Sequence, residues 1–400
     1  MLQVIPLEKG RERLASEAAL RTVRAERAEW NRAAGRVLAE DIVAGEDLPA
    51  FSRASVDGWA VVAADTFGAS ASLPALLRLA GEVKMGEHAS FALQPGSCAA
   101  VWTGGELPRG ADAMVMLEEA ETLSGGIVAV ETPTVPGRHI VFRGDDTRRG
   151  TVVFSKGKRL SPRDIGVLAA LGVSKVPVAK RPRVCVLSTG DELVDPSETP
   201  VGAQIRDCNG PMLTAACERA GAEVLLCSRV PDDETELLER MRSLAEYCDL
   251  LLLSGGSSAG EKDAGVRCLG ALGEVFFHGL AVKPGKPAFA GKIGGSLVIG
   301  LPGHPAAACL MFCELVLPLL AALQGEIHWQ RTLPARLAAA VPSNHGREEL
   351  VPVLLAGEEA NPVISKSGLI AALARADGYI RIPRDTEGLL TGARVDVILF

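Results

Sequence analysis

The amino-acid sequence lacks an excess of basic residues and lacks cysteine pairs with CxxC spacing. Its 400 residues include 42 Lys and Arg against 49 Asp and Glu, a formal net charge of −7. Such a balance provides no general positive field for a nucleic-acid backbone, so we expect no nucleic-acid partner. The nine cysteines lie mostly in apolar segments, as reduced core thiols do, and this predicts a reducing compartment and a cytoplasmic protein.

Unbroken apolar stretches are also scarce. Glu8 and Lys9 lie where a secretory signal needs its apolar region, so we expect no export signal. Segment 305–324 resembles a membrane span in length, but it contains Glu314 and Pro318. Because a carboxylate at the bilayer centre costs about 2.5 to 3.5 kcal/mol, we expect a buried helix here and no membrane partner.

The chain contains enough apolar residues, 48%, for several cores. Since one core rarely serves more than roughly 250 to 300 residues, we expect at least two domains. Residues 6–39 are predicted to be largely helical, with Leu7 and Leu14 on one face. Short apolar runs separated by Gly and Pro indicate a β-rich unit at 41–136, and similar runs after residue 327 indicate a separate small β domain.

Between these β-rich regions the chain alternates strand and helix patterns. The expected strands are 184–187, 223–227, 250–253, 275–282 and 296–299, and the expected helices are 210–220, 234–246, 264–272 and the apolar segment from Pro305. This alternation predicts a multidomain α/β protein with a parallel sheet and crossover helices. Ligands of such sheets bind outside the carboxyl ends of the strands.

Two loops follow expected strands directly. The first contains Ser188, Gly190, Asp191 and Glu192, whose hydroxyl and carboxylate groups would lie where a ligand docks. Either carboxylate could hold a hard cation, and the alternative is a tight turn capped by Asp191. The second loop is rich in glycine and serine and could cradle a phosphate, although it lacks the P-loop lysine pattern and an ordinary turn remains the alternative. Its candidate residues are Ser254, Gly255, Gly256, Ser257 and Gly260.

Three acids follow separate expected strands: Glu192, Asp232 and Asp263. Asp232 and Asp263 each precede an expected helix, so each could cap free N–H groups, and Asp263 could instead coordinate Mg²⁺. Gathered at one sheet edge, the three would repel one another unless a cation or a lysine offset their charge.

Two lysines and a helix start provide candidate anion contacts. Lys283 and Lys286 flank a Pro-Gly pair that stiffens the backbone, and solvated surface lysines in a turn are the alternative. Pro302 and Gly303 lead into the N-terminus of an expected helix, which suits an anion, while His304 alone is expected to be structural.

Two further loops lie outside the α/β region. Asp57 belongs to a loop in which polar residues, an acid and Trp59 meet, with an Asp-Gly turn as the alternative. Thr103 precedes paired glycines at the end of an extended run, where it could contact an oxyanion or form part of a turn.

In this order, the motifs resemble the molybdopterin molybdenumtransferases, the bacterial MoeA and gephyrin E-domain family, over nearly the whole chain. The resemblance rests on segments 55–60, 103–104, 110–113, 143–146, 188–193, 254–263, 283–287 and 301–305. It implies an elongated homodimer with a doubly wound three-layer α/β domain of the molybdopterin-binding type and a C-terminal β-barrel-like domain. The implied division is an extended helical and strand domain for dimerisation (1–44 and 139–180), a β-rich inserted domain (45–138), the α/β domain (181–327) and the C-terminal domain (328–400).

The resemblance also implies an activity: molybdate is inserted into the dithiolene of adenylylated molybdopterin, with release of AMP. Glu192 and Asp263 would hold Mg²⁺ at the nucleotide phosphate, and Lys283 would face the anions. Asp57 and Thr103, from another domain or the partner subunit, would complete the catalytic set with Asp263 and Lys283. The implied substrate-binding residues are Ser188, Gly190, Asp191, Glu192, Asp232, Ser254, Gly255, Gly256, Ser257, Gly260, Lys286, Pro302, Gly303 and Ser367. Molybdopterin adenylyltransferase and molybdoenzyme chaperones are the implied protein partners.

Three positions depart from the family pattern. Many relatives carry Lys or Arg where this chain has Gly279, an Asn where it has His304, and some an Arg where it has Pro352. These departures leave the oxyanion contacts, and the choice between molybdate and tungstate, open. Two other functions also remain open at this point: adenylyl transfer to molybdopterin, and a non-catalytic scaffold of the gephyrin type.

Overall fold

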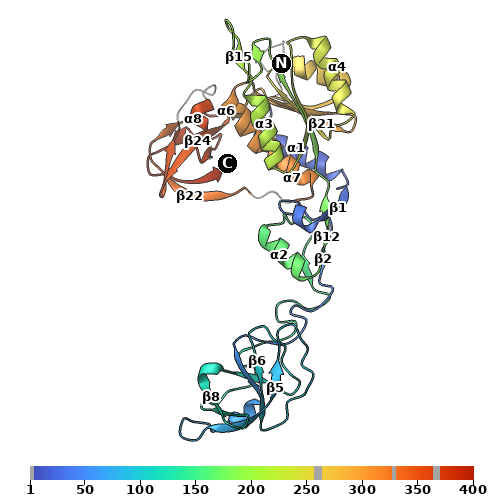
Figure 1. The fold of residues 1–400 in the computed structure, drawn as a ribbon. Coiled ribbons are helices and arrows are strands. Elements are labelled where there is room, and N and C mark those ends of the chain that lie inside the picture. Colours follow the sequence, from blue (N-terminus) through green and yellow to red (C-terminus); the bar gives the residue numbers. More distant parts are fainter. Residues whose placement is uncertain (1–3, 256–263, 327–329, 364–369) are drawn as a thin grey trace.

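The computed structural model describes residues 4–255, 264–326, 330–363 and 370–400. It is elongated: the α/β domain and the C-terminal domain lie at one end, and the inserted β domain lies at the other, joined by a narrow extended segment (Figure 1). The candidate site lies at the first of these ends, where loops of the α/β domain are near the C-terminal domain.

A six-stranded sheet with the order β16-β13-β17-β21-β20-β18 forms the centre of the α/β domain. The strands are β13 (Arg183–Thr189), β16 (Glu223–Val230), β17 (Leu250–Ser254), β18 (Glu274–His278), β20 (Phe289–Ile293) and β21 (Ser296–Leu301). The first four in spatial order are parallel, but β20 runs antiparallel to both β21 and β18. The strands that the sequence predicted are therefore parallel to one another, and the antiparallel strand β20 was not predicted: Gly294 and Gly295 form a tight turn that pairs it with β21 as a hairpin.

The expected strand 275–282 was also wrong in its extent. It ends at His278, and Val282–Lys283 forms a separate strand, β19, which pairs with the C-terminal domain. Gly279 between them has a φ of +103°, a conformation that interrupts a strand and suits glycine.

Helices cover both faces of the sheet, as the three-layer prediction requires. They are α3 (Asn209–Arg219), α4 (Glu234–Ala245), α5 (Ala264–Leu272), α6 (Pro305–Met311), the π-helical turn η4 (Phe312–Val316) and α7 (Leu317–Leu323). Alternate residues of β13 enter opposite cores: Val184 and Val186 pack in one with Leu213, while Cys185 and Leu187 pack in the other. This alternation follows from the two-residue period of a strand.

The helical run Pro305–Leu323 is long and apolar enough to cross a membrane by length and composition. Two thirds of its apolar window, 67%, is buried inside the protein, where it packs against the sheet and against α1 (Leu7–Ala19). Its apolar surface is thus accounted for by the core, as the sequence predicted.

The extended segment is built from two stretches of chain, one before and one after the inserted domain. Helix α1 is followed by β1 (Ala25–Glu29), which pairs antiparallel with β12 (Lys175–Ala179), so the prediction that 6–39 is largely helical was wrong after Ala19. The partner strand lies far along the chain, and no local pattern shows it. The other elements here are η1 (Trp30–Arg32), β2 (Ile42–Val43), β3 (Arg53–Ala54), β10 (Ile140–Val141), β11 (Val152–Phe154) and α2 (Pro162–Ala170).

The inserted domain is a six-stranded β sheet with the order β7-β4-β6-β5-β9-β8, as its short apolar runs predicted. Its elements are β4 (Gly58–Val61), η2 (Ala63–Thr66), β5 (Ala75–Val83), β6 (Ser97–Val101), β7 (Ala113–Met116), η3 (Leu117–Glu119), β8 (Ala120–Leu123) and β9 (Ile127–Val130).

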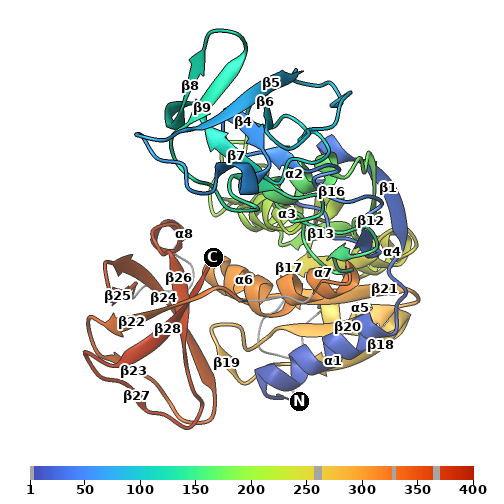
Figure 2. The same cartoon turned by 90° about the horizontal axis from the view of Figure 1, so that it is seen from below.

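In the C-terminal domain, β24 pairs with both β25 and β26 and thereby closes a five-stranded barrel, which confirms the barrel-like expectation. Its elements are β22 (Thr332–Leu337), β23 (Val341–Pro342), β24 (Glu348–Ala356), β25 (Glu359–Pro362), α8 (Ile370–Leu373), β26 (Gly378–Ile382), β27 (Gly388–Leu389) and β28 (Arg394–Leu399). Figure 2 shows the barrel and α8 beside α6.

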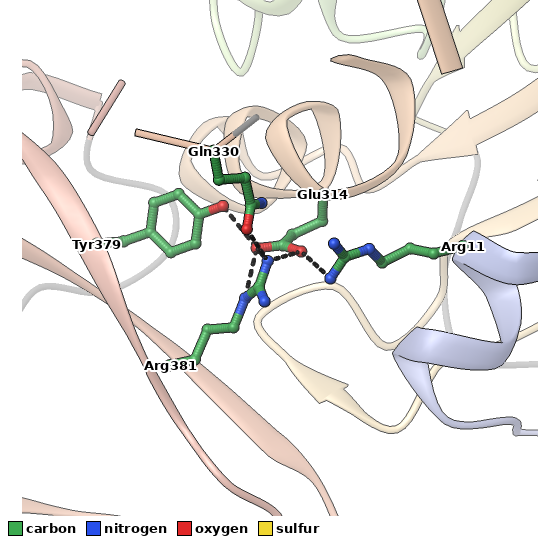
Figure 3. A network of polar contacts seen from close by, with 5 residues as sticks. All are labelled: Arg11, Glu314, Gln330, Tyr379 and Arg381. Carbon is green, nitrogen blue, oxygen red and sulfur yellow. Dashed lines mark hydrogen bonds and ion pairs between the residues drawn. The ribbon is translucent and has the colours of Figure 1, made fainter. Parts of the chain in front are cut away.

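A buried carboxylate joins three parts of the chain, and we call its surroundings the Glu314 junction (Figure 3). Glu314 of η4 is fully buried and accepts hydrogen bonds from Tyr379 (2.5 Å) and Arg381 (2.7 to 3.0 Å) of β26 and from Arg11 of α1 (3.3 Å). Arg381 also donates to Gln330. The barrel, the α/β domain and the N-terminal helix therefore meet at one ionic cluster.

Candidate functional site

The carboxyl ends of the parallel strands meet at one edge of the sheet, because Ser188 of β13 is in register with Ser254 of β17, and Ser254 with Leu301 of β21. A cavity of about 1220 Å³ lies there. Among its lining residues are eight that the sequence predicted: Ser188, Gly190, Glu192, Asp232, Ser254, Gly255, Pro302 and Gly303. We call this cavity the strand-end pocket.

Other predicted residues are not brought into the pocket or cannot be placed. Asp191, Lys283 and Lys286 do not line it, although Asp191 contacts the backbone of Asp232 at its rim. The predicted residues that lie outside the described parts of the chain are Gly256, Ser257, Gly260, Asp263 and Ser367.

Glycine lets the loops of the pocket approach one another closely. Gly255 has a φ of +98°, and a Cβ added there would lie 2.3 Å from the carbonyl oxygen of Thr189. Gly285 has a φ of +125°, and an added Cβ would lie 2.5 Å from the sulfur of Met311. Any larger residue would push these loops apart, so the close approach at both positions requires glycine.

Two hydroxyls of the pocket are buried without partners in the described parts of the chain. Ser188 is 1% exposed and Thr189 is 6% exposed, and neither side-chain oxygen makes a hydrogen bond there. A buried polar group left unsatisfied costs about 1 to 3 kcal/mol. A ligand that offers oxygen or nitrogen atoms at this edge would remove that cost.

Carboxylates converge on the same edge. Asp191 Oδ1 accepts the backbone N–H of Asp232 at 3.0 Å, and Glu192 lines the pocket beside them. Burial, followed by the charges of Asp191 and Glu192, raises the pKa of Asp232. Within residues 4–255, 264–326, 330–363 and 370–400, no three His, Cys, Asp or Glu side chains form a group that could hold a metal, and the predicted ligand Asp263 lies outside these ranges.

The lysine loop reaches the pocket through its backbone turn. Pro284, Gly285 and Pro287 line the cavity. The ammonium group of Lys283 instead lies 2.6 Å from Glu349 Oε1, where β19 pairs with β24 of the barrel. The barrel thus holds one wall of the pocket, and Lys283 makes an interdomain ion pair in this arrangement.

Our sequence interpretation missed a buried group at the start of α3. Asp207 is 5% exposed and accepts the N–H of Gly210 at 2.9 Å, while Asn209 is 6% exposed and donates to Ser254 and Gly303. Asp207 followed three residues later by a helical N–H is a helix-start pattern, and this signal could have drawn attention to the segment.

Asp57 and Thr103 contact each other in the inserted domain. The backbone N–H and the hydroxyl of Thr103 donate to Asp57 Oδ1 at 2.7 and 2.8 Å, and these two bonds hold the pKa of Asp57 below its usual value. Asp57 directly precedes β4 and Thr103 lies two residues after β6, and these strands lie at the end of the molecule opposite the α/β domain of the same chain (Figure 1). The pairing is present, but the pair is remote from the pocket of its own chain.

Comparisons with known proteins match all of these regions. Residues 5–172 match the family model "MoeA N-terminal region (domain I and II)", residues 185–322 match "Probable molybdopterin binding domain", and residues 334–400 match "MoeA C-terminal region (domain IV)". Molybdopterin molybdenumtransferase 2 of Mycobacterium tuberculosis is 34% identical over 92% of this chain and 93% of that protein. The molybdopterin molybdenumtransferase of Staphylococcus aureus (strain COL) is 30% identical over 91% of this chain and 88% of its own length.

Solved structures agree along the full length. The molybdopterin biosynthesis MoeA protein of Pyrococcus horikoshii OT3 superposes with a TM-score of 0.87 at 32% identity, covering 100% of both chains. A second structure of a Pyrococcus MoeA protein gives a TM-score of 0.86 at 36% identity, covering 99% of both.

Proposed function

Because this chain belongs to the MoeA family of molybdopterin molybdenumtransferases, enzymes of molybdenum cofactor biosynthesis, we propose that its strand-end pocket binds adenylylated molybdopterin. In the proposed reaction molybdate exchanges oxygen for the two dithiolene sulfurs, this oxygen leaves with the thiol protons as water, and one water molecule cleaves the phosphoanhydride so that AMP leaves. The chain is a transferase of this pathway.

The observation that carries the pocket assignment is the pair of buried hydroxyls without partners, Ser188 and Thr189. They lie at the carboxyl end of β13, the place where open α/β sheets bind ligands. A phosphate ester supplies several acceptor oxygens within a small volume, and the cavity of about 1220 Å³ has room for a nucleotide joined to a pterin.

Magnesium suits the acids at the rim. Asp191 and Glu192 lie near Asp232, whose pKa is raised by burial and then by their charges, but within the described residues these side chains do not form a metal-binding group without Asp263. Oxygen ligands of this kind are those that Mg²⁺ prefers in proteins. Glu192, together with Asp263, would hold the ion, and the bound ion would neutralise charge on the phosphates. Asp191 keeps the backbone of Asp232 in place at this rim.

The pair formed by Asp57 and Thr103 is proposed to act in the pocket of the other subunit of a homodimer. Two observations support this: the pair is remote from the pocket of its own chain, and Thr103 keeps the Asp57 carboxylate charged and oriented. An exposed carboxylate fixed by two hydrogen bonds is suited to position a second reactant. We further propose a cytoplasmic location, in keeping with nine cysteines that form no disulfide in this fold.

Molybdenum transfer is favoured over the two other functions considered. The relatives named as molybdenumtransferases match this chain through all three regions, including the inserted and C-terminal domains that nucleotide transfer to molybdopterin would not require. The pocket contains buried hydroxyls without hydrogen-bond partners, which favours a ligand-binding enzyme. A scaffold binds no ligand there, so these hydroxyls would destabilise it without any gain.

The deciding experiment supplies adenylylated molybdopterin, Mg²⁺ and molybdate and measures AMP release together with activation of a cofactor-free molybdoenzyme. We expect both signals to depend on molybdate and on Mg²⁺. AMP release is expected to fall when Asp232→Asn replaces the rim carboxylate, while Asp233→Asn, the neighbouring cap of α4, serves as the matched control with AMP release retained. Cofactor formation that proceeds equally well with the protein omitted would contradict the proposal and favour the scaffold.

A further inference from the structure

One buried amide joins three segments of the strand-end pocket. Asn209, the first residue of α3, is 6% exposed and lines the cavity. Its Nδ2 lies 2.9 Å from Ser254 Oγ at the end of β17 and 2.7 Å from the carbonyl oxygen of Gly303 beyond β21. A single side chain therefore connects the end of β17 and the segment after β21 with the start of helix α3.

The chemistry of these partners fixes the direction of each hydrogen bond. A carbonyl oxygen only accepts, so the atom of Asn209 facing Gly303 must be its NH₂ group. The other hydrogen of that group points to Ser254 Oγ, which therefore accepts. A serine oxygen that accepts here still has its own hydrogen, and Ser254, 2% exposed, donates that hydrogen to no acceptor in the described ranges.

We propose that Asn209 is a positioning residue that fixes the Ser254 hydroxyl as a hydrogen-bond donor toward phosphate oxygens of the ligand. The inference rests on the proposed function, because it requires a phosphate-bearing ligand in the pocket. The register of the sheet adds a second donor at the same level: Ser188 lies beside Ser254, and its buried hydroxyl also lacks a partner. Two adjacent hydroxyl donors suit an anion that only accepts hydrogen bonds, such as the ionised phosphoanhydride of the proposed ligand.

Two substitutions separate this role from simple packing. Asn209→Asp keeps the shape of the side chain, but an ionised carboxylate only accepts, so it would draw the Ser254 hydrogen away from the ligand. Ser254→Ala removes the hydroxyl itself. If Asn209 acts through Ser254, the two changes remove the same bond, and their effects overlap in the double variant. Asn361→Asp, on strand β25 of the barrel, is the matched control for an added carboxylate.

The probe is AMP with Mg²⁺, and the measurement is the calorimetric dissociation constant of each variant, with thermal unfolding recorded without AMP. We expect each single change in the pocket to weaken AMP binding about tenfold, as expected for loss of one hydrogen bond to a charged group. The double variant should bind only slightly more weakly than Asn209→Asp alone, and Asn361→Asp should bind like the unchanged protein. Should Asn209→Asp not fold, Asn209→Ser takes its place in the cycle.

A pH series adds a readout that a packing defect would not produce. Burial raises the pKa of a carboxyl, so the carboxyl introduced by Asn209→Asp should gain a proton and donate again as pH falls from about 8 to about 5.5. The ratio of its dissociation constant to that of the unchanged protein should then decrease. Additive effects in the cycle, or an unchanged affinity of Asn209→Asp, would overturn the inference. Failure of the unchanged protein itself to bind AMP would instead overturn the proposed function.

Discussion

The Glu314 junction and the strand-end pocket use the same kinds of groups in opposite ways. At the junction the fully buried carboxylate of Glu314 accepts hydrogen bonds from Tyr379, Arg381 and Arg11. None of these three donors belongs to the helical turn η4 that carries Glu314. In the pocket, buried hydroxyls such as Ser188 have no partner in the described ranges. The paired polar groups of the junction hold the structure together, whereas the unpaired hydroxyls of the pocket are available to a ligand.

The charges around the two sites differ in the same way: they are balanced at the junction and of like sign at the pocket rim. Glu314 and the Tyr379 hydroxyl raise the pKa of Arg381 against the opposing effect of burial, while burial and Glu314 together raise the pKa of Tyr379. At the pocket rim the acids face one another, and the pKa of Asp232 rises through burial and like charge. Substitutions at the junction should therefore mainly lower the stability of the fold, and substitutions in the pocket should mainly change ligand binding.

The largest expected effect is on stability at the junction. Glu314→Gln leaves Arg381 and Arg11 near a neutral amide, and we expect a loss of about 3 kcal/mol. This lies at the lower end of the range for breaking a buried pair, because the side chain of Arg381 retains 27% exposure and that of Arg11 32%. The measurement is denaturant unfolding followed through the α/β domain and the barrel.

The matched control is an ion pair of the same length on the surface. Lys9 and Glu12 lie 2.7 Å apart with side-chain exposures of 66% and 53%, as against 2.7 Å for the Glu314–Arg381 pair. Glu12→Gln should leave the free energy of unfolding almost unchanged. Equal losses from the two substitutions would contradict the view that burial makes the junction matter.

The second expected effect is on binding at the pocket. Glu192→Gln removes one of the converging acids, so the unliganded protein should unfold at an unchanged or higher temperature, and the pKa of Asp232 should fall. Apparent Mg²⁺ affinity in the AMP-release assay should weaken by about 10- to 100-fold, a range typical of losing a group that supports a metal site.

Glu198→Gln, at an exposed position of the following loop, is the control for this substitution and should change neither quantity. A marked loss of stability in Glu192→Gln without AMP or Mg²⁺ would place Glu192 with the satisfied groups of the junction and remove the contrast between the two regions.

The pocket was more predictable from sequence than the junction, for a topological reason. Buried parallel strands appear as short apolar runs, and their carboxyl ends must share one edge, so Ser188, Glu192, Asp232 and Ser254 could be assigned to one place. Strand β20 (Phe289–Ile293), between β21 and the edge strand β18, was missed because its pairing depends on a hairpin rather than on a crossover.

Contacts between domains were not predictable from local patterns. The sequence correctly assigned segment 305–324 to a core because Glu314 is costly in a bilayer, but nothing near it in the chain identifies Arg381 as its partner. The same holds for the pairing of Lys283 with Glu349, where the sequence led us to expect a lysine facing anions. Asn209 escaped notice because an amide acquires its role only from the two loops that it joins.

A third prediction concerns the boundary between the two regions. Glu349 is mostly buried, accepts from Ser343 at 2.9 Å and pairs with the half-exposed Lys283. Glu349→Gln should cost less than about 1 kcal/mol, because the pair is open to solvent on the lysine side. It should also tighten AMP binding about two- to fivefold at low salt, since the released ammonium adds positive charge beside the lysine loop.

Two measurements check this, thermal unfolding and AMP titration at low and high salt, with Glu358→Gln on the exposed turn between β24 and β25 as the control. Unchanged AMP affinity at both salt concentrations would assign Lys283 wholly to the interdomain contact and withdraw its predicted part in anion binding.

The smallest expected effect lies in the inserted domain, where a satisfied acid is also a proposed functional group. Thr103→Val removes the hydroxyl bond to Asp57 and leaves the backbone bond, so the pKa of Asp57 should rise toward its usual value while staying below it. Hydrogen bonds to the charged form stabilise the fold above the unfolded-state pKa, and this contribution disappears as pH falls through the folded-state pKa. The stability difference between the two proteins should therefore be present at neutral pH and vanish in acid.

Carboxyl NMR titration of Asp57 measures this shift, with Thr122→Val on the exposed strand β8 as the control. Because Asp57 stays ionised at neutral pH in Thr103→Val, AMP release should fall less than in Asp57→Asn. A loss as large as that of Asp57→Asn, with only a small change in pKa, would mean that the Thr103 hydroxyl itself contacts a reactant. Asp57 and Thr103 would then resemble the pocket, where hydroxyls without partners are available to a ligand, rather than the junction, where the polar groups already bind one another.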